Sequence, residues 1–296
     1  MKTKTLILVV AVLIAVPMLA QAPPPPGYPQ GQAPPPPSFS PARLDQLVAR
    51  IALYPDSLLA QILAAATFPD QIPDAARWAD QHHYLTGQAL ADAIQGDQVP
   101  WDPSVQALLP FPSVLEMMNS DMGWTTDLGN AFLAQQQDVM DAVQRERHRA
   151  QSYGYLRSNG QILVGGGPFI TIAPVDPGYI VVPYYDPGIV FFAPRPGFAV
   201  GLGIRFGFGV TIGAFFRPWG WGYGRFDWGA HAVFINNARW GRTWFNRGVY
   251  VHPYPGIHGR GPGPRAVEHH ELQGRSEHER SAAREGRARV EEHGHR

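Results

Sequence analysis

Apolar residues recur at helical spacing along the first well-patterned part of the chain. They fill one face over 44–51 and again over 58–63, and Tyr54-Pro55-Asp56 separates the two runs. A proline interrupts a helix, and an aspartate can cap the helix that follows it. The pattern therefore predicts two consecutive helices within 44–67, with Asp56 as the N-cap of the second.

Helical periodicity continues as far as residue 151. A long final helix is expected over 125–151, with a narrow apolar stripe that Gln135 and Gln136 interrupt. Asp102 and Pro103 are typical of a helix start, as cap and first helical residue. Further helices are expected over 72–81, from Thr86 to about residue 94, over 103–109 and over 113–121. Three tryptophans, Trp78, Trp101 and Trp124, are interpreted as core anchors of this helical module.

Strand-like periodicity replaces the helical pattern after residue 154. The runs 169–173, 179–184 and 189–192 are rich in β-branched and aromatic residues. Two copies of Asp-Pro-Gly, at 176–178 and 186–188, supply the chemistry of tight turns. Each copy is interpreted as a turn followed by a strand, and together they predict a small β-meander packed on the long helix.

The segment 200–214 is apolar enough to suggest a membrane helix. Bulky residues occupy its even positions, whereas its odd positions hold five glycines, one arginine and one threonine. A period of two in a glycine-rich sequence favours a strand or hairpin with one bulky and one bare face. A glycine-zipper helix in the membrane is the alternative. The glycine spacing does not fit a nucleotide-binding loop, so no nucleotide cofactor is expected.

Tryptophan, glycine and arginine alternate over 215–254 and form the most function-like part of the sequence. Aromatic faces stack on sugars or bases, and guanidinium groups hold phosphates or carboxylates. The expected ligands are cell-wall glycan, lipopolysaccharide or, last, nucleic acid; the alternative is that the tryptophans pack on glycine-rich strands and on one another. The candidate ligand-binding residues are Arg217, Trp219, Trp221, Arg239, Trp240, Arg242 and Trp244.

The first residues have the layout of a secretory signal peptide: Lys2 and Lys4, an apolar run over 6–16, and small residues at Ala20 and Ala22. Cleavage after either alanine is possible, and an uncut segment would be a short anchor. Residues 23–42 are proline-rich and predict an extended spacer, or a ligand for aromatic grooves. We therefore expect an exported protein of the periplasm or cell envelope.

Composition adds three constraints. The chain has no cysteine, which excludes disulfides and thiol catalysis, and 62 of its 296 residues are glycine or proline. Residues 43–153 hold 14 acidic residues and 6 arginines (−8), whereas 154–256 hold 3 and 8 (+5). These halves could attract each other or carry ordinary solvated surfaces. Four basic residues end the long helix, where they complement its dipole or contact an anion: Arg145, Arg147, His148 and Arg149.

The tail over 257–296 mixes arginine, glutamate and histidine with few apolar residues, which predicts disorder. Its histidines could collect zinc, copper or nickel, with His269, His270 and His278 as the candidate ligands, although no fixed ligand spacing is present. No catalytic motif is found anywhere in the sequence. A non-enzymatic protein without a cofactor is therefore expected.

Several long motifs in order are similar to those of a bacterial envelope family known as domain of unknown function 3300. They lie at 44–63, 75–80, 100–118, 124–151 and 172–187. The resemblance covers about 43–190 and implies export and a mostly helical body. It implies no activity, cofactor or catalytic residue.

Taken together, the patterns predict an α+β fold with a multi-helix module followed by a β-meander and a glycine-rich ribbon. The domain boundaries expected are 1–22 for the signal, 23–42 for the linker, 43–192 for the folded domain, 193–256 for an extension and 257–296 for the tail. The function expected first is binding of cell-wall glycan or another envelope protein. Metal buffering by the tail is the second hypothesis, and a wall-modifying enzyme the third. Membrane contact is expected only through an uncut signal or 200–214.

Overall fold

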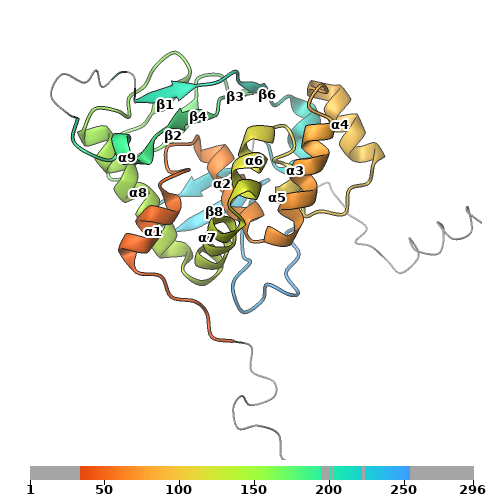
Figure 1. Cartoon of the computed structure of the whole chain (residues 1–296), viewed down its shortest axis with the longest axis horizontal. Helices are drawn as coiled ribbons and strands as arrows, with labels where there is room; N and C mark the ends of the chain where they lie inside the picture. The colour runs from red at the N-terminus through yellow and green to blue at the C-terminus, as the bar shows by residue number, and fades with distance from the viewer. Residues whose placement is uncertain (1–33, 195–200, 202, 222–223, 254–296) are drawn as a thin grey trace, which may run out of the picture. The chain divides into compact units, whose positions relative to one another are not determined.

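The computed structural model describes residues 34–194, 201, 203–221 and 224–253. The described residues from Pro36 onward belong to one compact unit. The expected signal segment, most of the linker and the tail lie outside the described residues. The helices and strands confirm the α+β prediction, with helices first and small antiparallel sheets after them (Figure 1).

Helices occupy most of the chain from Pro41 to Ser152, and three of them match the expected bounds within two residues. The helical elements are α1 (Pro41–Val48), α2 (Asp56–Ala66), η1 (Pro69–Gln71), α3 (Ile72–Gln81), α4 (Gly87–Gly96), α5 (Pro103–Gln106), α6 (Pro112–Ser120), α7 (Met122–Ala134) and α8 (Gln136–Ser152). Asp102 caps α5 as predicted, because its Oδ1 accepts a hydrogen bond from the Ser104 N–H at 2.9 Å. Trp124 is buried, whereas Trp78 and Trp101 are half-buried against the core.

Helix α2 lies at the centre of the core. Every residue from Leu58 to Ala66 is buried. Helix α2 contacts helices α5 and α7 as well as the later strands β7 (Arg225–Asp227) and β8 (Ala232–Ile235) (Figure 1). A helix that is apolar all round is stable only when other elements surround it. Helix α7 approaches so closely that a Cβ added at Gly129 would lie 1.9 Å from the Ala66 carbonyl oxygen.

Two helical predictions need correction. Asp56 does not cap α2; its carboxylate instead accepts hydrogen bonds from Arg147 on α8 and, at 3.3 Å, from the Ile172 N–H. The single helix expected over 125–151 is two helices, α7 and α8, which meet at the non-helical Gln135 (φ −139°, ψ 48°). The Gln135 side chain bonds both the N–H and the carbonyl of Phe39, and this tie holds the break in place.

The strands form two-stranded antiparallel pairs and one three-stranded sheet. The order is β1–β2, β3–β6, β4–β5 and β7–β8–β9. The second Asp-Pro-Gly is followed by a helical turn rather than a strand, because Asp186 caps it and Pro187 opens it. The elements are β1 (Ile162–Val164), β2 (Ile172–Pro174), β3 (Tyr179–Ile180), β4 (Pro183–Tyr185), α9 (Pro187–Val190), β5 (Ile204–Phe206), β6 (Val210–Thr211), η3 (Ala214–Trp219), β7 (Arg225–Asp227), β8 (Ala232–Ile235) and β9 (Ala238–Arg239).

The described part of 200–214 contains strands, as the alternation predicted. Aromatic rings cover its glycines: a Cβ added at Gly207 would lie 2.8 Å from the Tyr184 ring, and one at Gly209 would lie 2.3 Å from the Tyr179 ring. The bare face is therefore the surface on which these rings pack. Among the described residues, no helix is both long and apolar enough to cross a membrane.

Candidate functional site

Three of the four tryptophans expected to bind a ligand lie in the interior. Trp219, Trp221 and Trp240 are 4%, 1% and 2% exposed. The indole N–H of Trp221 donates to the Ala107 carbonyl at 2.9 Å, and that of Trp219 donates to the Gln106 side chain at 2.6 Å. Trp219 and Trp221 therefore bond to residues at α5, whereas the Trp240 ring packs against Tyr250 and His252. All three are buried among side chains of the protein itself, as the packing alternative describes.

The remaining candidates divide between the interior and the surface. Arg242 is 9% exposed and donates to the Thr67 carbonyl, whereas Arg217 and Arg239 are exposed. Trp244 is half-buried, with the Arg247 guanidinium 3.7 Å from its ring centroid. His269, His270 and His278 lie outside the described residues, so metal binding by the tail stays a prediction. Within the described ranges, no group of three or more potential ligands could hold a metal ion.

The basic end of α8 has a structural use that neither interpretation anticipated. Arg147 is fully buried and donates to the carbonyls of Ala52, Tyr54 and Ile170 at 2.8–3.0 Å. Its guanidinium also pairs with Asp56 at 2.7 Å and lies 5.0 Å from the Trp228 ring centroid. Arg147 therefore fastens the loop before α2, the loop before β2 and the last sheet to α8 at one point.

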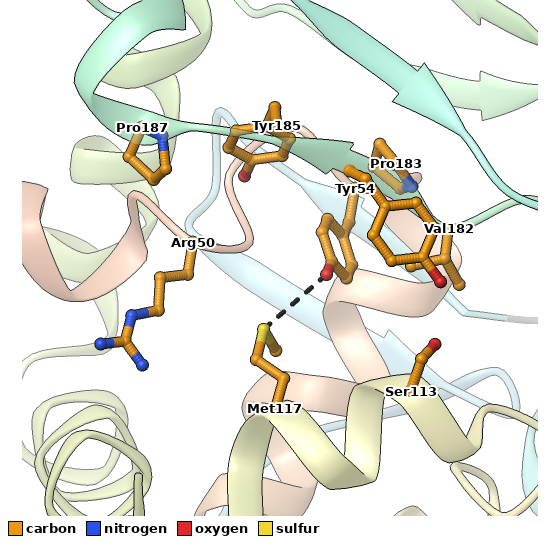
Figure 2. A pocket seen from close by; sticks show the side chains of 9 residues that line it. Arg50, Tyr54, Ser113, Met117, Val182, Pro183, Tyr185 and Pro187 are labelled. Atoms are coloured by element: carbon orange, nitrogen blue, oxygen red, sulfur yellow. Dashed lines mark hydrogen bonds between the residues drawn. The ribbon is translucent and has the colours of Figure 1, made fainter. Parts of the chain in front are cut away.

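A cleft of about 260 Å³ lies between strand β4, helix α6 and the loop that joins α1 to α2. Figure 2 shows Tyr54 at its centre, with Pro183 and Tyr185 of β4 on one side and Met117 and Ser113 of α6 on the other. The lining residues are Arg50, Tyr54, Ser113, Met117, Val182, Pro183, Tyr184, Tyr185 and Pro187.

Hydrogen bonds and ring contacts fix the lining of this cleft. The Tyr54 hydroxyl contacts the Met117 sulfur at 3.8 Å, and the Tyr185 hydroxyl accepts from the Leu53 N–H at 3.3 Å. The two tyrosine rings pack edge to face, with centroids 6.4 Å apart. Burial raises the pKa of both hydroxyls, so each stays protonated at physiological pH. They therefore present neutral, largely apolar rings to the cleft.

One charged and one exposed side chain complete the rim. Arg50 pairs with Asp121 at 2.8 Å and lies 5.2 Å from the Trp124 ring centroid, so its charge is held beside the opening. Tyr184 is 50% exposed. A cleft of aromatic rings, prolines and a thioether, with a salt-bridged arginine at its edge, is suited to an uncharged, largely apolar ligand.

Comparison with known proteins identifies the family. The profile described as "Protein of unknown function (DUF3300)" matches residues 40–252. The chain belongs to the DUF3300 family. It is 36% identical over 187 residues to the "Uncharacterized protein YacH" of Escherichia coli (strain K12), an alignment that covers 52% of this chain and 30% of that protein. No solved structure matches the chain.

The DUF3300 match extends over both the helices and the later strands, which share one hydrophobic core. It includes the strands β5–β9, which lie beyond the stretch of about 43–190 on which the resemblance rests. All nine cleft residues lie within three of the five motifs that carry the resemblance, at 44–63, 100–118 and 172–187. Sequence reasoning missed the cleft because these motifs are far apart in the chain; Tyr54 and the Pro-Tyr-Tyr at 183–185 were the available signal.

Proposed function

We propose that this DUF3300 protein is an exported, non-enzymatic binding protein of the cell envelope, and that the cleft at β4 holds an extended segment of another envelope protein. The observation that carries this proposal is the convergence of three motifs, distant in the sequence, on one aromatic cleft. These motifs build a shared concave surface as well as a core, and concave surfaces are where ligands bind.

The chemistry of the lining favours a polypeptide over a glycan. Sugars present many hydroxyl groups, but the cleft offers few polar partners besides Ser113, Arg50 and the Tyr184 hydroxyl, since the other two tyrosine hydroxyls already have partners. Prolines, tyrosines and a methionine accommodate apolar side chains and extended backbone. Strand β4 pairs only with β5 among the described strands, so an extended segment beside it would be a second strand partner, with Tyr184 and Tyr185 as the residues of β4 that have an N–H.

Export rests on the sequence. The basic start, the apolar run over 6–16 and the alanines at 20 and 22 have the order of a signal peptide, and the proline-rich residues after them suit a spacer. Fractionation of cells that produce the full chain, followed by mass spectrometry, tests this directly. A shortened N-terminus in the envelope fraction is expected; an intact chain in the cytosol contradicts the proposal.

Binding is tested on an array of overlapping peptides from envelope proteins, with purified cell-wall sacculi in parallel. We expect the chain over 23–296 to bind a subset of peptides and to lose this binding in Tyr184→Ala and Met117→Ala. Tyr84→Ala is the matched control, because Tyr84 is 70% exposed and lies outside the cleft. Binding that survives both cleft substitutions refutes the site. Binding to sacculi that both substitutions abolish, with no peptide bound, assigns the cleft to glycan.

A further inference from the structure

The last described part of the chain displays apolar side chains to solvent. Phe245, Val249 and Val251 are 81%, 84% and 84% exposed, within a loop over 241–251 that we call the display loop. Figure 1 shows this segment, in blue, as an open loop that projects beyond helix α7. Three such residues within seven positions form a patch of the kind that marks an interaction surface.

Side-chain contacts of Arg242 hold the base of the display loop in place. Arg242 lies at its root and donates to the Thr67 carbonyl at 2.6 Å and to the Arg247 carbonyl at 2.8 Å. The same guanidinium lies 3.6 Å from the Phe68 ring centroid. Burial lowers the pKa of Arg242 from its usual value. One buried cation therefore joins both arms of the loop to the end of helix α2.

Asn246 holds the turn at the far end. Its side chain accepts from the Thr243 N–H at 2.7 Å and donates to the Gly241 carbonyl at 2.9 Å, while its backbone carbonyl accepts from the Val249 and Tyr250 N–H groups at 2.9 Å. The Gly241 N–H donates to the Tyr250 hydroxyl at 2.9 Å. These bonds fix the backbone, so the outward direction of the apolar side chains is a property of the fold.

The segment that contains the display loop carries only positive formal charges. Residues 228–253 contain no aspartate or glutamate, but they contain three arginines, of which Arg239 is exposed. The acidic groups that act on Arg242 at the loop's root are Asp70 and Asp102. An apolar tip in a segment without acidic residues, with Arg239 exposed two residues before the loop, is complementary to the interface of an anionic lipid bilayer.

We propose that the display loop docks this protein on an anionic lipid surface, with Phe245, Val249 and Val251 entering the headgroup region and Arg239 beside the phosphates. A projecting tip with three apolar side chains fits a fluid surface, whereas a protein partner would need a larger complementary area. The display loop shares no residue with the cleft, so each proposal can be refuted without affecting the other.

The test is sedimentation of the chain over 23–296 with vesicles of phosphatidylcholine alone or mixed in equal parts with phosphatidylglycerol. Residues 1–22 are removed so that their apolar run cannot insert; the compact unit begins at Pro36 and is left whole. We expect binding to the mixed vesicles, weakened at least about tenfold in the triple variant Phe245→Ser, Val249→Ser, Val251→Ser. Arg239→Gln should weaken it about fivefold, on mixed vesicles only.

Phe208→Ser is the matched control, since Phe208 is fully exposed on a different turn. It should leave vesicle binding unchanged, and thermal melts should show that every variant is folded. Equal loss in Phe208→Ser and the triple variant overturns the assignment to the display loop. Absence of binding by the unchanged chain, or a dimer that the triple variant abolishes without any vesicle binding, overturns the lipid proposal.

Discussion

Replacement of Arg147 by methionine should be among the most damaging single changes in this chain. Methionine replaces the aliphatic part of the arginine side chain, but it leaves the space of the guanidinium group empty and donates no hydrogen bond. Asp56 would lose its cationic partner at 2.7 Å, and the carbonyls of Ala52, Tyr54 and Ile170 would lose their donor in a site where Arg147 is fully buried.

The size of the loss follows from these partners. Each buried carbonyl left unsatisfied costs about 1 kcal/mol or more, and removal of one member of a buried ion pair costs about 3–5 kcal/mol in total effect. We expect the free energy of unfolding to fall by about 3–5 kcal/mol, a large share of the roughly 5–15 kcal/mol that holds a domain together. The melting temperature should fall by about 10 °C.

Urea denaturation followed by tryptophan fluorescence, with calorimetry beside it, measures this loss. Arg145→Met is the matched control from the same turn of α8, because Arg145 is 38% exposed and its partner Asp45 keeps a second arginine, Arg149, at 3.1 Å. It should cost less than about 1 kcal/mol. A loss below about 1 kcal/mol in Arg147→Met, or equal losses in the two variants, would refute the assignment of Arg147 as a buried clamp.

Two further predictions concern the same core. Burial raises the pKa of Glu146 to about 7, from 4.5 in the unfolded chain, so its contribution to stability is full below about pH 4.5 and is lost as the pH rises through 7. Glu146→Gln should remove this pH-dependent fall in the free energy of unfolding, which amounts to at most about 3 kcal/mol between pH 4.5 and 8. If the unchanged protein and Glu146→Gln show the same dependence of unfolding free energy on pH, the prediction is contradicted. Gly129→Ala places a Cβ against the Ala66 carbonyl and should cost about 2 kcal/mol or more, because α2 and α7 must separate. Gly96→Ala, with open space around it, should be neutral in the same melts.

Local signals predicted the local structure well. The helix over 72–81, the Asp102 cap and the strand character of 204–211 all follow from periodicity and capping chemistry. Predictions failed where a side chain prefers a distant partner to a neighbour. The Asp56 carboxylate accepts a hydrogen bond from Arg147 instead of capping its own helix. The Gln135 side chain accepts one from the N–H of Phe39, 96 residues away. A pattern of neighbouring residues in the sequence cannot predict such a distant partner.

The candidate sites show the same division. Tryptophan, glycine and arginine in alternation predict aromatic contact but not its partner, and for Trp219, Trp221 and Trp240 the partner is the protein itself. The cleft could not be predicted because Tyr54, Met117 and Pro183 meet only after the helices and β4 pack. The exposure of Phe245 likewise depends on Arg242 and Asn246, whose roles are invisible without the loop's backbone.

The late position of Trp219 and Trp221 in the chain bears on the order of folding during synthesis. Their indole groups complete hydrogen bonds to α5 and bury against it, more than 100 residues after α5 has been made. A growing chain that ends before residue 219 therefore leaves the central helices incompletely covered. In a protein threaded unfolded through a narrow pore, such a closing segment near the end would postpone stable folding until most of the chain has crossed.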